Sequence, residues 1–374
     1  MTELRPFRID VPDAVLTDLR RRIIDTRWPE AETVPDWSQG VPLGYTRELA
    51  AHWADGYDWR ATEATLNRFE QFTTEIDGLP IHFLHARSPH PEAFPLIITH
   101  GWPGSVLEFA KVIEPLTDPT AHGGRAADAF HVVCPSLPGY GFSGKPAATG
   151  WNVARIAAAW ETLMTRLGYD RYGAQGGDWG AAVTTEMGRN AGHCAAIHTN
   201  MPIATPPDQL DPEADRAALE ALAYYRRWDS GYAKQQSTRP QTLGYGLLDS
   251  PVALLAWIVE KFWSWTDCDG HPENALTRDE MLGTVTLYWV TGTAASSARL
   301  YWETRGAFRP GARVELPTGV ASFPKEIGRA PRAWCEPNYA ITHWTDMPRG
   351  GHFAAFEQPE LFVGDLRAFF GTVR

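Results

Sequence analysis

One aspartate in the sequence has neighbours that could make it a nucleophile. Asp178 lies in the run Gly-Gly-Asp-Trp-Gly, after a short stretch that could form a strand and before a run compatible with a helix. A sharp turn from strand to helix strains the backbone of its corner residue and pushes that side chain outward, and glycines leave room for the turn. A carboxylate with an ordinary pKa of about 3.9 is anionic at neutral pH and needs no base before it attacks. Attack on a carbonyl would give an anhydride that reverts easily, so the productive electrophile is an alkyl carbon with a leaving group, such as an epoxide or a haloalkane.

The run resembles the nucleophile elbow of the α/β-hydrolases, with aspartate where most members have serine. The structural alternative is that Asp178 only caps the following helix, because aspartate is a favoured capping residue. An α/β-hydrolase presents its active residues on loops at the carboxyl ends of strands, in the chain order nucleophile, acid, histidine. That order predicts where an acid and a histidine should follow Asp178.

A histidine occurs at the place that this order requires. His352 lies in the run Arg-Gly-Gly-His-Phe, after the last expected strand and before the last expected helix. The alternative is that His352 is an ordinary loop histidine without a catalytic role. His343 lies within a strand-like run and is expected to be structural. We therefore assign the base to His352.

The acid should follow the strand before the last one. Glu326 comes just past an expected strand at 320–323. Its competitors are Glu336 and Asp346, of which Asp346 is closer to His352 in the sequence but lies in the next connection. We favour Glu326 because of its place directly after a strand.

Two backbone amides are expected to stabilise negative charge on the reacting carboxylate. In α/β-hydrolases these donors come from the residue after the nucleophile and from a loop after an early strand. The first is Trp179, and the second is Trp102 in the run His-Gly-Trp-Pro-Gly-Ser, although such a run can also be an ordinary tight turn. Neither this run nor the glycines around Tyr140 have the spacing of a dinucleotide or phosphate loop.

Composition limits the class of protein. The 374 residues carry 34 basic and 45 acidic side chains and a net charge of -11, and without a basic run no nucleic-acid partner is expected. The 4 cysteines are scattered and indicate neither a disulfide framework nor a zinc site. We see no apolar targeting segment or membrane span, and expect a cytoplasmic protein with no membrane partner. The 16 tryptophans could line an apolar pocket, but the sequence singles out no substrate-binding residue. It is compatible with a homo-oligomer.

The elements around these residues indicate an α/β fold. Residues 1–70 are expected to be a helical and irregular extension. Over 71–205 expected strands alternate with helices, which predicts a mostly parallel, eight-stranded sheet with helices on both faces. Residues 206–312 are predicted to form an inserted helical cap, and the sheet domain resumes over 313–374.

Nearly the whole sequence resembles the epoxide hydrolases of the microsomal and juvenile-hormone type. The resemblance is carried by the motifs TRWP at 26–29, HGWPGS at 100–105, SLPGYGFSG at 136–144, GGDWG at 176–180, YAKQQSTRP at 232–240, YWVTGT at 288–293 and RGGHFAAFE at 349–357. It implies an α/β-hydrolase fold with the amino-terminal domain of that family. The membrane anchor of the microsomal members has no counterpart in the sequence, which again leads us to expect no membrane location.

The resemblance also implies a reaction and its residues. An apolar epoxide and water would give a vicinal diol, with Asp178 as nucleophile, Glu326 and His352 as acid and base, and Tyr232 and Tyr301 of the cap as ring-opening acids. A phenol with a pKa of about 10 can protonate the poor alkoxide leaving group. Without the resemblance, either tyrosine could equally pack the cap. Carboxylate, phenol and imidazole cover each step, so no metal and no organic cofactor is implied.

Two other functions remain as alternatives. A haloalkane dehalogenase uses the same aspartate, histidine and acid, and Trp179 beside the nucleophile could bind its halide. The cap tyrosines favour the epoxide. A non-catalytic relative is the third hypothesis, but such proteins usually lose a reacting group, and here none is lost.

Overall fold

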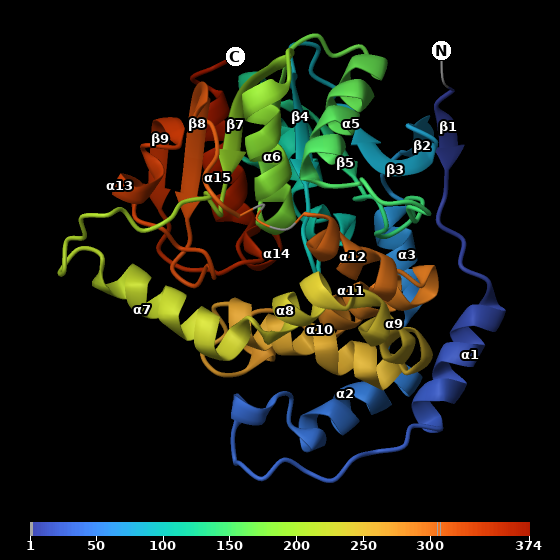
Figure 1. The fold of residues 1–374 in the computed structure, drawn as a ribbon. Coiled ribbons are helices and arrows are strands. Elements are labelled where there is room, and N and C mark those ends of the chain that lie inside the picture. Colours follow the sequence, from blue (N-terminus) through green and yellow to red (C-terminus); the bar gives the residue numbers. More distant parts are fainter. Residues whose placement is uncertain (1–2, 305, 307) are drawn as a thin grey trace.

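The computed structural model of the chain describes residues 3–304, 306 and 308–374. In these residues nine strands form one sheet in the order β1-β2-β3-β5-β4-β6-β7-β8-β9 (Figure 1). The strands from β5 to β9 in that order are parallel, whereas β1, β2 and β3 are antiparallel to their neighbours. In chain order the strands span Arg5–Phe7, Gln71–Ile76, Leu79–Ala86, Phe94–Thr99, Phe130–Pro135, Tyr172–Gly176, Cys194–Thr199, Val314–Ser322 and Tyr339–Asp346.

The sheet has one strand more than the sequence predicted. Strand β1 comes from the segment that was expected to be helical and irregular, and Arg5 of β1 pairs with Thr73 of β2. A strand of three residues is too short to show the alternation of apolar and polar residues by which strands are recognised. Its pairing ties the N-terminal segment to the antiparallel edge of the sheet.

Helices cover both faces of the sheet, as the alternation of strands and helices predicted. α5 (Val153–Arg166) and α6 (Asp178–Asn190) pack on one face, and α4 (Ile113–Thr117) and α15 (Pro359–Phe370) pack on the other (Figure 1). Ile97 of β4 belongs to the buried cluster under α5 and α6. Its neighbours Leu96 and Ile98 belong to the cluster under α15, because successive side chains of a strand point to opposite faces. The described chain thus has the α/β-hydrolase architecture.

The inserted cap lies between β7 and β8, at the carboxyl ends of the parallel strands (Figure 1). Its helices span Arg216–Tyr224 (α7), Gly231–Thr238 (α8), Pro240–Asp249 (α9), Pro251–Trp265 (α10), Arg278–Thr291 (α11) and Ala294–Glu303 (α12), with a π-helical turn at Tyr225–Asp229. Among the described residues no single helix combines the length and apolar character needed to cross a membrane. Only α9 and α10 do so when taken together, and they are bent by 115°.

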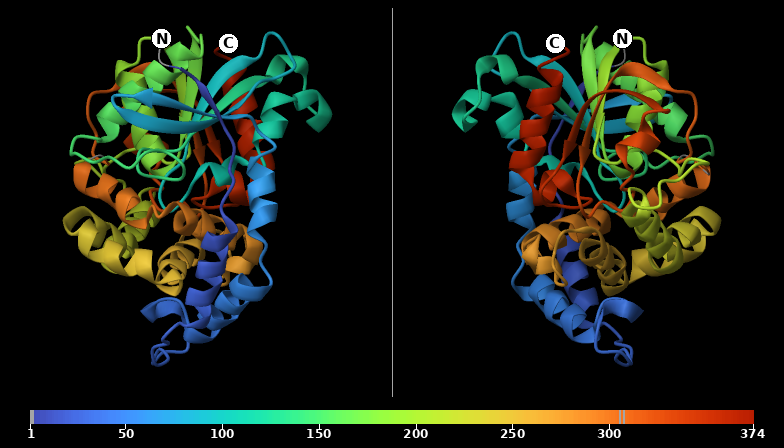
Figure 2. Two further views of the ribbon diagram at one scale, coloured as in Figure 1. Left: turned by 90° about the vertical axis from the view of Figure 1, so that its right-hand side faces the viewer. Right: turned by 90° about the vertical axis from the view of Figure 1, so that its left-hand side faces the viewer.

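The N-terminal extension packs against the cap on the side away from the sheet (Figure 2). α1 (Asp13–Ile24) and α2 (Leu43–Asp55) contact α10, and α3 (Trp59–Leu66) contacts α11. In one of these contacts, the indole Nε1 of Trp53 donates a hydrogen bond to Thr286 Oγ1 at 2.8 Å. The cap is therefore held between the N-terminal helices and the sheet domain.

The remaining elements are short. The final helix, expected as one run, is divided into α14 (Ala354–Glu357) and α15 at Gln358, because a residue before proline avoids the helical conformation and Pro359 begins a new helix. Short helical turns lie at Trp37–Gln39, Val106–Phe109, Pro119–His122, Ala126–Asp128, Pro272–Asn274 and Arg332–Cys335 (α13).

Helix α6 approaches the end of β4 unusually closely. Gly180 lies in the first turn of α6, and a Cβ atom built on it would be 1.9 Å from the backbone oxygen of Thr99. Two backbones cannot approach in this way unless the residue between them has no side chain. The start of α6 is therefore pressed against the strand end from which the loop containing Trp102 departs.

We predict that Gly180→Ala lowers the free energy of unfolding by about 1–3 kcal/mol, or prevents folding, because the extra methyl group meets backbone that cannot rotate away. The control is Gly364→Ala in α15, where a Cβ would meet nothing within 4 Å. That change should leave stability unchanged or raise it by up to about 1 kcal/mol, since alanine is the better helix former. Urea unfolding followed by circular dichroism measures both. Equal midpoints for the two variants would contradict the close approach of α6 and β4.

Candidate active site

Asp178 occupies the corner between β6 and α6. Its φ of 50° lies in the left-handed region, which residues with a side chain rarely adopt. The residue is 6% exposed, and its Oδ1 accepts a hydrogen bond from the backbone N–H of Trp102 at 2.8 Å. The N-cap of α6 is Gly177. The carboxylate therefore points at the loop after β4 rather than capping its own helix.

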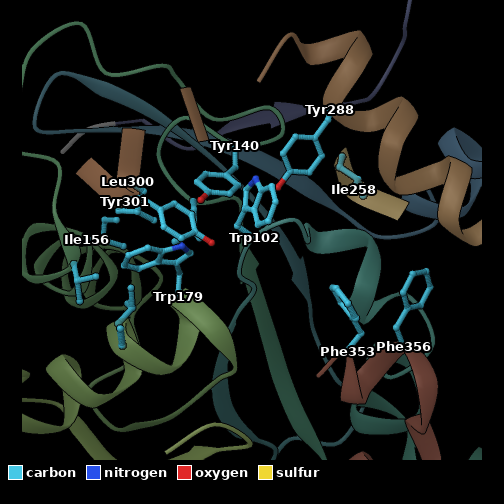
Figure 3. Close-up of a cluster of buried hydrophobic side chains, with 14 of the residues drawn as sticks. Trp102, Tyr140, Ile156, Trp179, Ile258, Tyr288, Leu300, Tyr301, Phe353 and Phe356 are labelled. Carbon is cyan, nitrogen blue, oxygen red and sulfur yellow. The ribbon is translucent and has the colours of Figure 1, made fainter. Parts of the chain in front are cut away.

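The Trp102 loop reaches Asp178 because the residue before it is glycine. A Cβ atom on Gly101 would lie 2.3 Å from the Asp178 side chain. Trp102 is 2% exposed, and its N–H, which the sequence predicted as an oxyanion donor, is the group that contacts Asp178 Oδ1. The other predicted donor, Trp179, directly follows the nucleophile at the start of α6. Figure 3 shows both indoles beside Tyr301, on different elements.

The structure brings His352 and Glu326 to Asp178. His352 Nε2 lies 3.5 Å from Asp178 Oδ2, and His352 Nδ1 lies 2.6 Å from Glu326 Oε1. A bridge between Lys325 and Gly351 continues the pairing of β8 and β9 beyond the strands and places the two loops side by side. These three side chains are almost fully buried, with 8%, 3% and 1% of the Asp178, His352 and Glu326 side chains exposed.

The competing residues lie elsewhere. Glu336 is exposed and pairs with Arg332, and Asp346 is exposed at the end of β9. His343 Nε2 lies 2.8 Å from Asp365 Oδ1, a contact that agrees with the structural role expected for this histidine. Among the acids considered from the sequence, Glu326 is the one that contacts His352.

The charge of His352 is governed by its two carboxylate neighbours. Burial opposes a positive charge on the imidazole, but the carboxylates of Glu326 and Asp178 outweigh burial and raise the pKa of His352 well above its usual value. The histidine is therefore protonated at neutral pH as long as both carboxylates are charged. Loss of either negative charge lowers this pKa.

The two cap tyrosines converge on the same loop. Tyr232 on α8 stacks on the Trp102 ring, with centroids 4.9 Å apart and planes 10° apart. Tyr301 on α12 meets the Trp102 ring edge-on at 6.0 Å and the Trp179 ring edge-on at 4.7 Å. The two phenol rings are 5.8 Å apart. Helices of the cap thus bring both tyrosines to the residues that flank Asp178.

The protonation state of both phenols follows from their burial. Burial raises the pKa of Tyr232 and of Tyr301 well above the ordinary value, so both keep their protons at neutral pH. The Tyr301 hydroxyl has no hydrogen-bond partner among the described residues. The Tyr232 hydroxyl lies 3.2 Å from the hydroxyl of Tyr225.

The sequence did not predict two residues that contact the candidate site, Tyr225 beside Tyr232 and Asn200 beside Glu326. Tyr225 lies in the π-helical turn before α8, and only the packing of the cap brings it to Tyr232. Asn200, at the end of β7, donates its Nδ2–H to Glu326 Oε2 at 3.3 Å. No motif in the sequence marked either residue.

A third missed residue lines a small cavity on the sheet side of the nucleophile. The cavity has a volume of about 20 Å³, enough for about one water molecule. Its lining includes Asp178, His352, Gln175, Asn200 and Glu108, and neither cap tyrosine. Burial raises the pKa of Glu108 to about 8. The capping-box spacing of this glutamate after a serine was visible in the sequence, and that box is present in the structure.

The comparisons with known proteins agree with this geometry. Residues 4–109 match the family model described as "Epoxide hydrolase N terminus", and residues 95–247 match the model "alpha/beta hydrolase fold". A putative epoxide hydrolase of Stigmatella aurantiaca is 56% identical over 99% of this chain and 86% of its own length. Epoxide hydrolase 1 of Sus scrofa is 37% identical over 99% of this chain and 89% of its own length.

Solved structures give the same result. The crystal structure of juvenile hormone epoxide hydrolase from the silkworm Bombyx mori matches with a TM-score of 0.92 and 32% identity, covering 100% of this chain and 95% of that one. Similarity of this extent in both sequence and structure shows common family membership. The chain is an enzyme of the epoxide hydrolase family, built on the α/β-hydrolase fold with an inserted helical cap.

Proposed function

We propose that the protein converts an apolar epoxide and water to a vicinal diol through a covalent ester of Asp178. One observation carries the proposal: the same buried carboxylate has His352 Nε2 at 3.5 Å from Oδ2 and the Trp102 N–H at 2.8 Å from Oδ1, while two cap phenols pack against Trp102. The groups proposed as nucleophile, base, amide donor and acids thus lie close together, around Asp178 and Trp102. An apolar substrate is favoured by the aromatic rings that surround it.

In the first step, a carboxylate oxygen of Asp178 attacks an epoxide carbon. The new carbon–oxygen bond forms as the ring carbon–oxygen bond breaks, and the electron pair of the broken bond stays on the epoxide oxygen. Tyr232 or Tyr301 gives that oxygen a proton as its charge develops, which is needed because an alkoxide is a poor leaving group. The product is a hydroxyalkyl ester of Asp178.

In the second step, water hydrolyses the ester. Esterification removes the negative charge of Asp178, which lowers the pKa of His352. The imidazolium then gives up its proton, which balances the proton that the tyrosine lost in ring opening, and His352 becomes the neutral base. His352, oriented by Glu326, takes a proton from water, and the water oxygen attacks the carbonyl carbon of the ester. The N–H of Trp102 and that of Trp179 stabilise the resulting oxyanion. When the oxyanion collapses, the bond between the carbonyl carbon and the diol oxygen breaks, and protonated His352 gives its proton to that oxygen. The diol leaves, and Asp178 is a carboxylate again. The small cavity beside Asp178 and His352 is on the side where this water is needed.

Further properties belong to the same proposal. The 4 cysteines are all unpaired, which fits a reducing compartment such as the cytoplasm.

The nearest alternative remains a haloalkane dehalogenase, in which the same aspartate would displace a halide. Packing of both cap phenols against Trp102 favours the epoxide, because a halide leaves without a proton.

A panel of substrates tests the function. Styrene oxide, an octene oxide and limonene oxide would be incubated beside chlorobutane and bromobutane, and diol and free halide would be measured. We expect diol from at least one epoxide, no halide, and no product with Asp178→Ala, which lacks the nucleophile. Halide without diol would move the assignment to a dehalogenase, and diol formed by Asp178→Ala would refute the covalent route.

The tyrosines are predicted to act in ring opening. Tyr232→Phe and Tyr301→Phe should each slow formation of the ester from an epoxide by about 100-fold, because a positioned general acid contributes roughly this much. Tyr245→Phe is the control, since that cap tyrosine is 70% exposed and should have no effect. Rapid-quench mass spectrometry of the intact protein measures the ester. Wild-type rates in both phenylalanine variants would contradict the assignment of the acids.

The hydrolytic step is predicted to depend on pH through His352. Only the neutral imidazole can accept a proton from water, so the rate of ester decay should rise with pH through the pKa of His352. Glu326→Gln removes a carboxylate that raises this pKa, and the rising limb should therefore move to lower pH. Glu336→Gln, at the exposed competitor, should leave the profile unchanged. If the rising part of the rate profile stays at the same pH or moves to higher pH with Glu326→Gln, that result would be evidence against Glu326 as the partner of His352.

A further inference from the structure

A lysine is buried inside the cap next to one of the proposed ring-opening acids. Lys261 of α10 is 2% exposed, and lysine is almost never buried to this degree unless it is paired. Its Nζ lies 2.9 Å from Asp229 Oδ1 and 2.5 Å from Glu260 Oε1. The same Nζ lies over the ring of Tyr232, 4.7 Å from the centroid. Two carboxylates therefore hold an ammonium group at the face of a phenol.

The partner carboxylate connects this lysine to the base as well. Asp229 Oδ2 accepts hydrogen bonds from Trp265 Nε1 at 2.5 Å and from Ser264 Oγ at 2.8 Å. The Trp265 ring meets the His352 ring edge-on at 5.0 Å. The backbone N–H of His352 donates a hydrogen bond to the backbone carbonyl of Trp265 at 2.8 Å. Lys261 Nζ also lies 5.3 Å from the Trp265 ring centroid. The ion pair of buried Lys261 and partly exposed Asp229 is thus in contact with the rings of both Tyr232 and Trp265.

The position of the ammonium has an electrostatic consequence for Tyr232. A cation over an aromatic face attracts the electron-rich ring, and the attraction grows as the phenol gains negative charge. Tyr232 gains such charge when its proton moves to the epoxide oxygen, so the interaction is stronger in the transition state than in the resting enzyme. Burial acts in the opposite direction, since it raises the pKa of Tyr232. A fixed positive charge close to the ring offsets part of that effect.

We propose that Lys261 is a positioning residue for ring opening, whose ammonium orients Tyr232 and stabilises the negative charge that Tyr232 gains as it protonates the epoxide oxygen. The inference rests on the proposed role of Tyr232 as an acid. The transferred proton comes from the Tyr232 hydroxyl, and Lys261 keeps its own protons throughout. The competing explanation is that Lys261 only neutralises Asp229 and Glu260 and so supports the packing of the cap.

Three substitutions separate these explanations. Ester formation would be measured by rapid-quench mass spectrometry in a His352→Gln background, in which the ester should accumulate, with the epoxide of the panel that is turned over fastest. Lys261→Met removes the positive charge. The double variant Lys261→Met/Asp229→Asn also removes the charge of Asp229, leaves that of the more exposed Glu260, and keeps an acceptor for the Trp265 indole. We expect both to slow ester formation about tenfold or more, the size of a desolvated cation–π interaction. Lys261→Arg keeps the charge and should recover part of the rate.

Dependence on the Tyr232 hydroxyl is the deciding observation. In a Tyr232→Phe protein, which retains Tyr301 as a donor, Lys261→Met should slow ester formation no further. In a Tyr301→Phe protein it should slow the step as much as in the parent. Lys111→Met is the matched control, because that lysine lies 5.0 Å from the centroid of the Phe356 ring and not over a cap tyrosine, and it should leave the rate unchanged.

The possible failures can be told apart. A full rate in Lys261→Met, recovery of the full rate in Lys261→Met/Asp229→Asn, or equal slowing with and without the Tyr232 hydroxyl would overturn the proposal for Lys261 alone. Full-rate ring opening by Tyr232→Phe would instead overturn the role of Tyr232 as an acid, and the role of Lys261 would fall with it.

Discussion

The placement of the Asp178 carboxylate depends on the backbone around it, which is held in a conformation that the chain would not adopt by itself. A side-chain-bearing residue at a φ of 50° costs about 1–3 kcal/mol, and tight packing on both sides offsets this cost. Gly180 lets α6 touch the end of β4, and Gly101 lets the next loop touch Asp178 itself. The Trp102 N–H then meets the carboxylate. Asp178, the end of β4 and the Trp102 N–H therefore form one tightly packed unit, in which no part can move without the others.

The cap and the sheet domain meet at aromatic rings directly over this unit. Trp102, from the sheet domain, contacts Tyr232, Tyr301 and Trp265 of the cap. Tyr232 and Tyr301 are only 6% and 7% exposed, so the proposed reaction requires substrate to separate some of these contacts. Ring pairs of this kind contribute about 0.5–1.5 kcal/mol each beyond the area they bury, so a local opening is inexpensive.

Features encoded by neighbouring residues were predictable from the sequence, and features that depend on distant packing were not. The corner at Asp178 and the place of His352 follow from short motifs with glycines at fixed positions. The contact between Glu326 and His352 depends on the register of β8 and β9, so the sequence supported only their order. Tyr232 and Tyr301 were found through resemblance alone, since cap packing has no local signature. Glu108 and Lys261 were missed because such residues are normally exposed. Strand β1 was too short to detect, and the domain limits near 205 and 312 stay predictions.

The covalent route through Asp178 is tested most directly by one turnover in water labelled with the heavy oxygen isotope, with enzyme in excess over epoxide. In the ester mechanism, water attacks the carbonyl carbon of the ester, so the diol takes its second oxygen from the carboxylate. The proposal therefore predicts an unlabelled diol and heavy oxygen in the peptide that contains Asp178. Label in the diol and none in that peptide would mean that water attacks the epoxide directly, which would contradict the role of Asp178 as nucleophile.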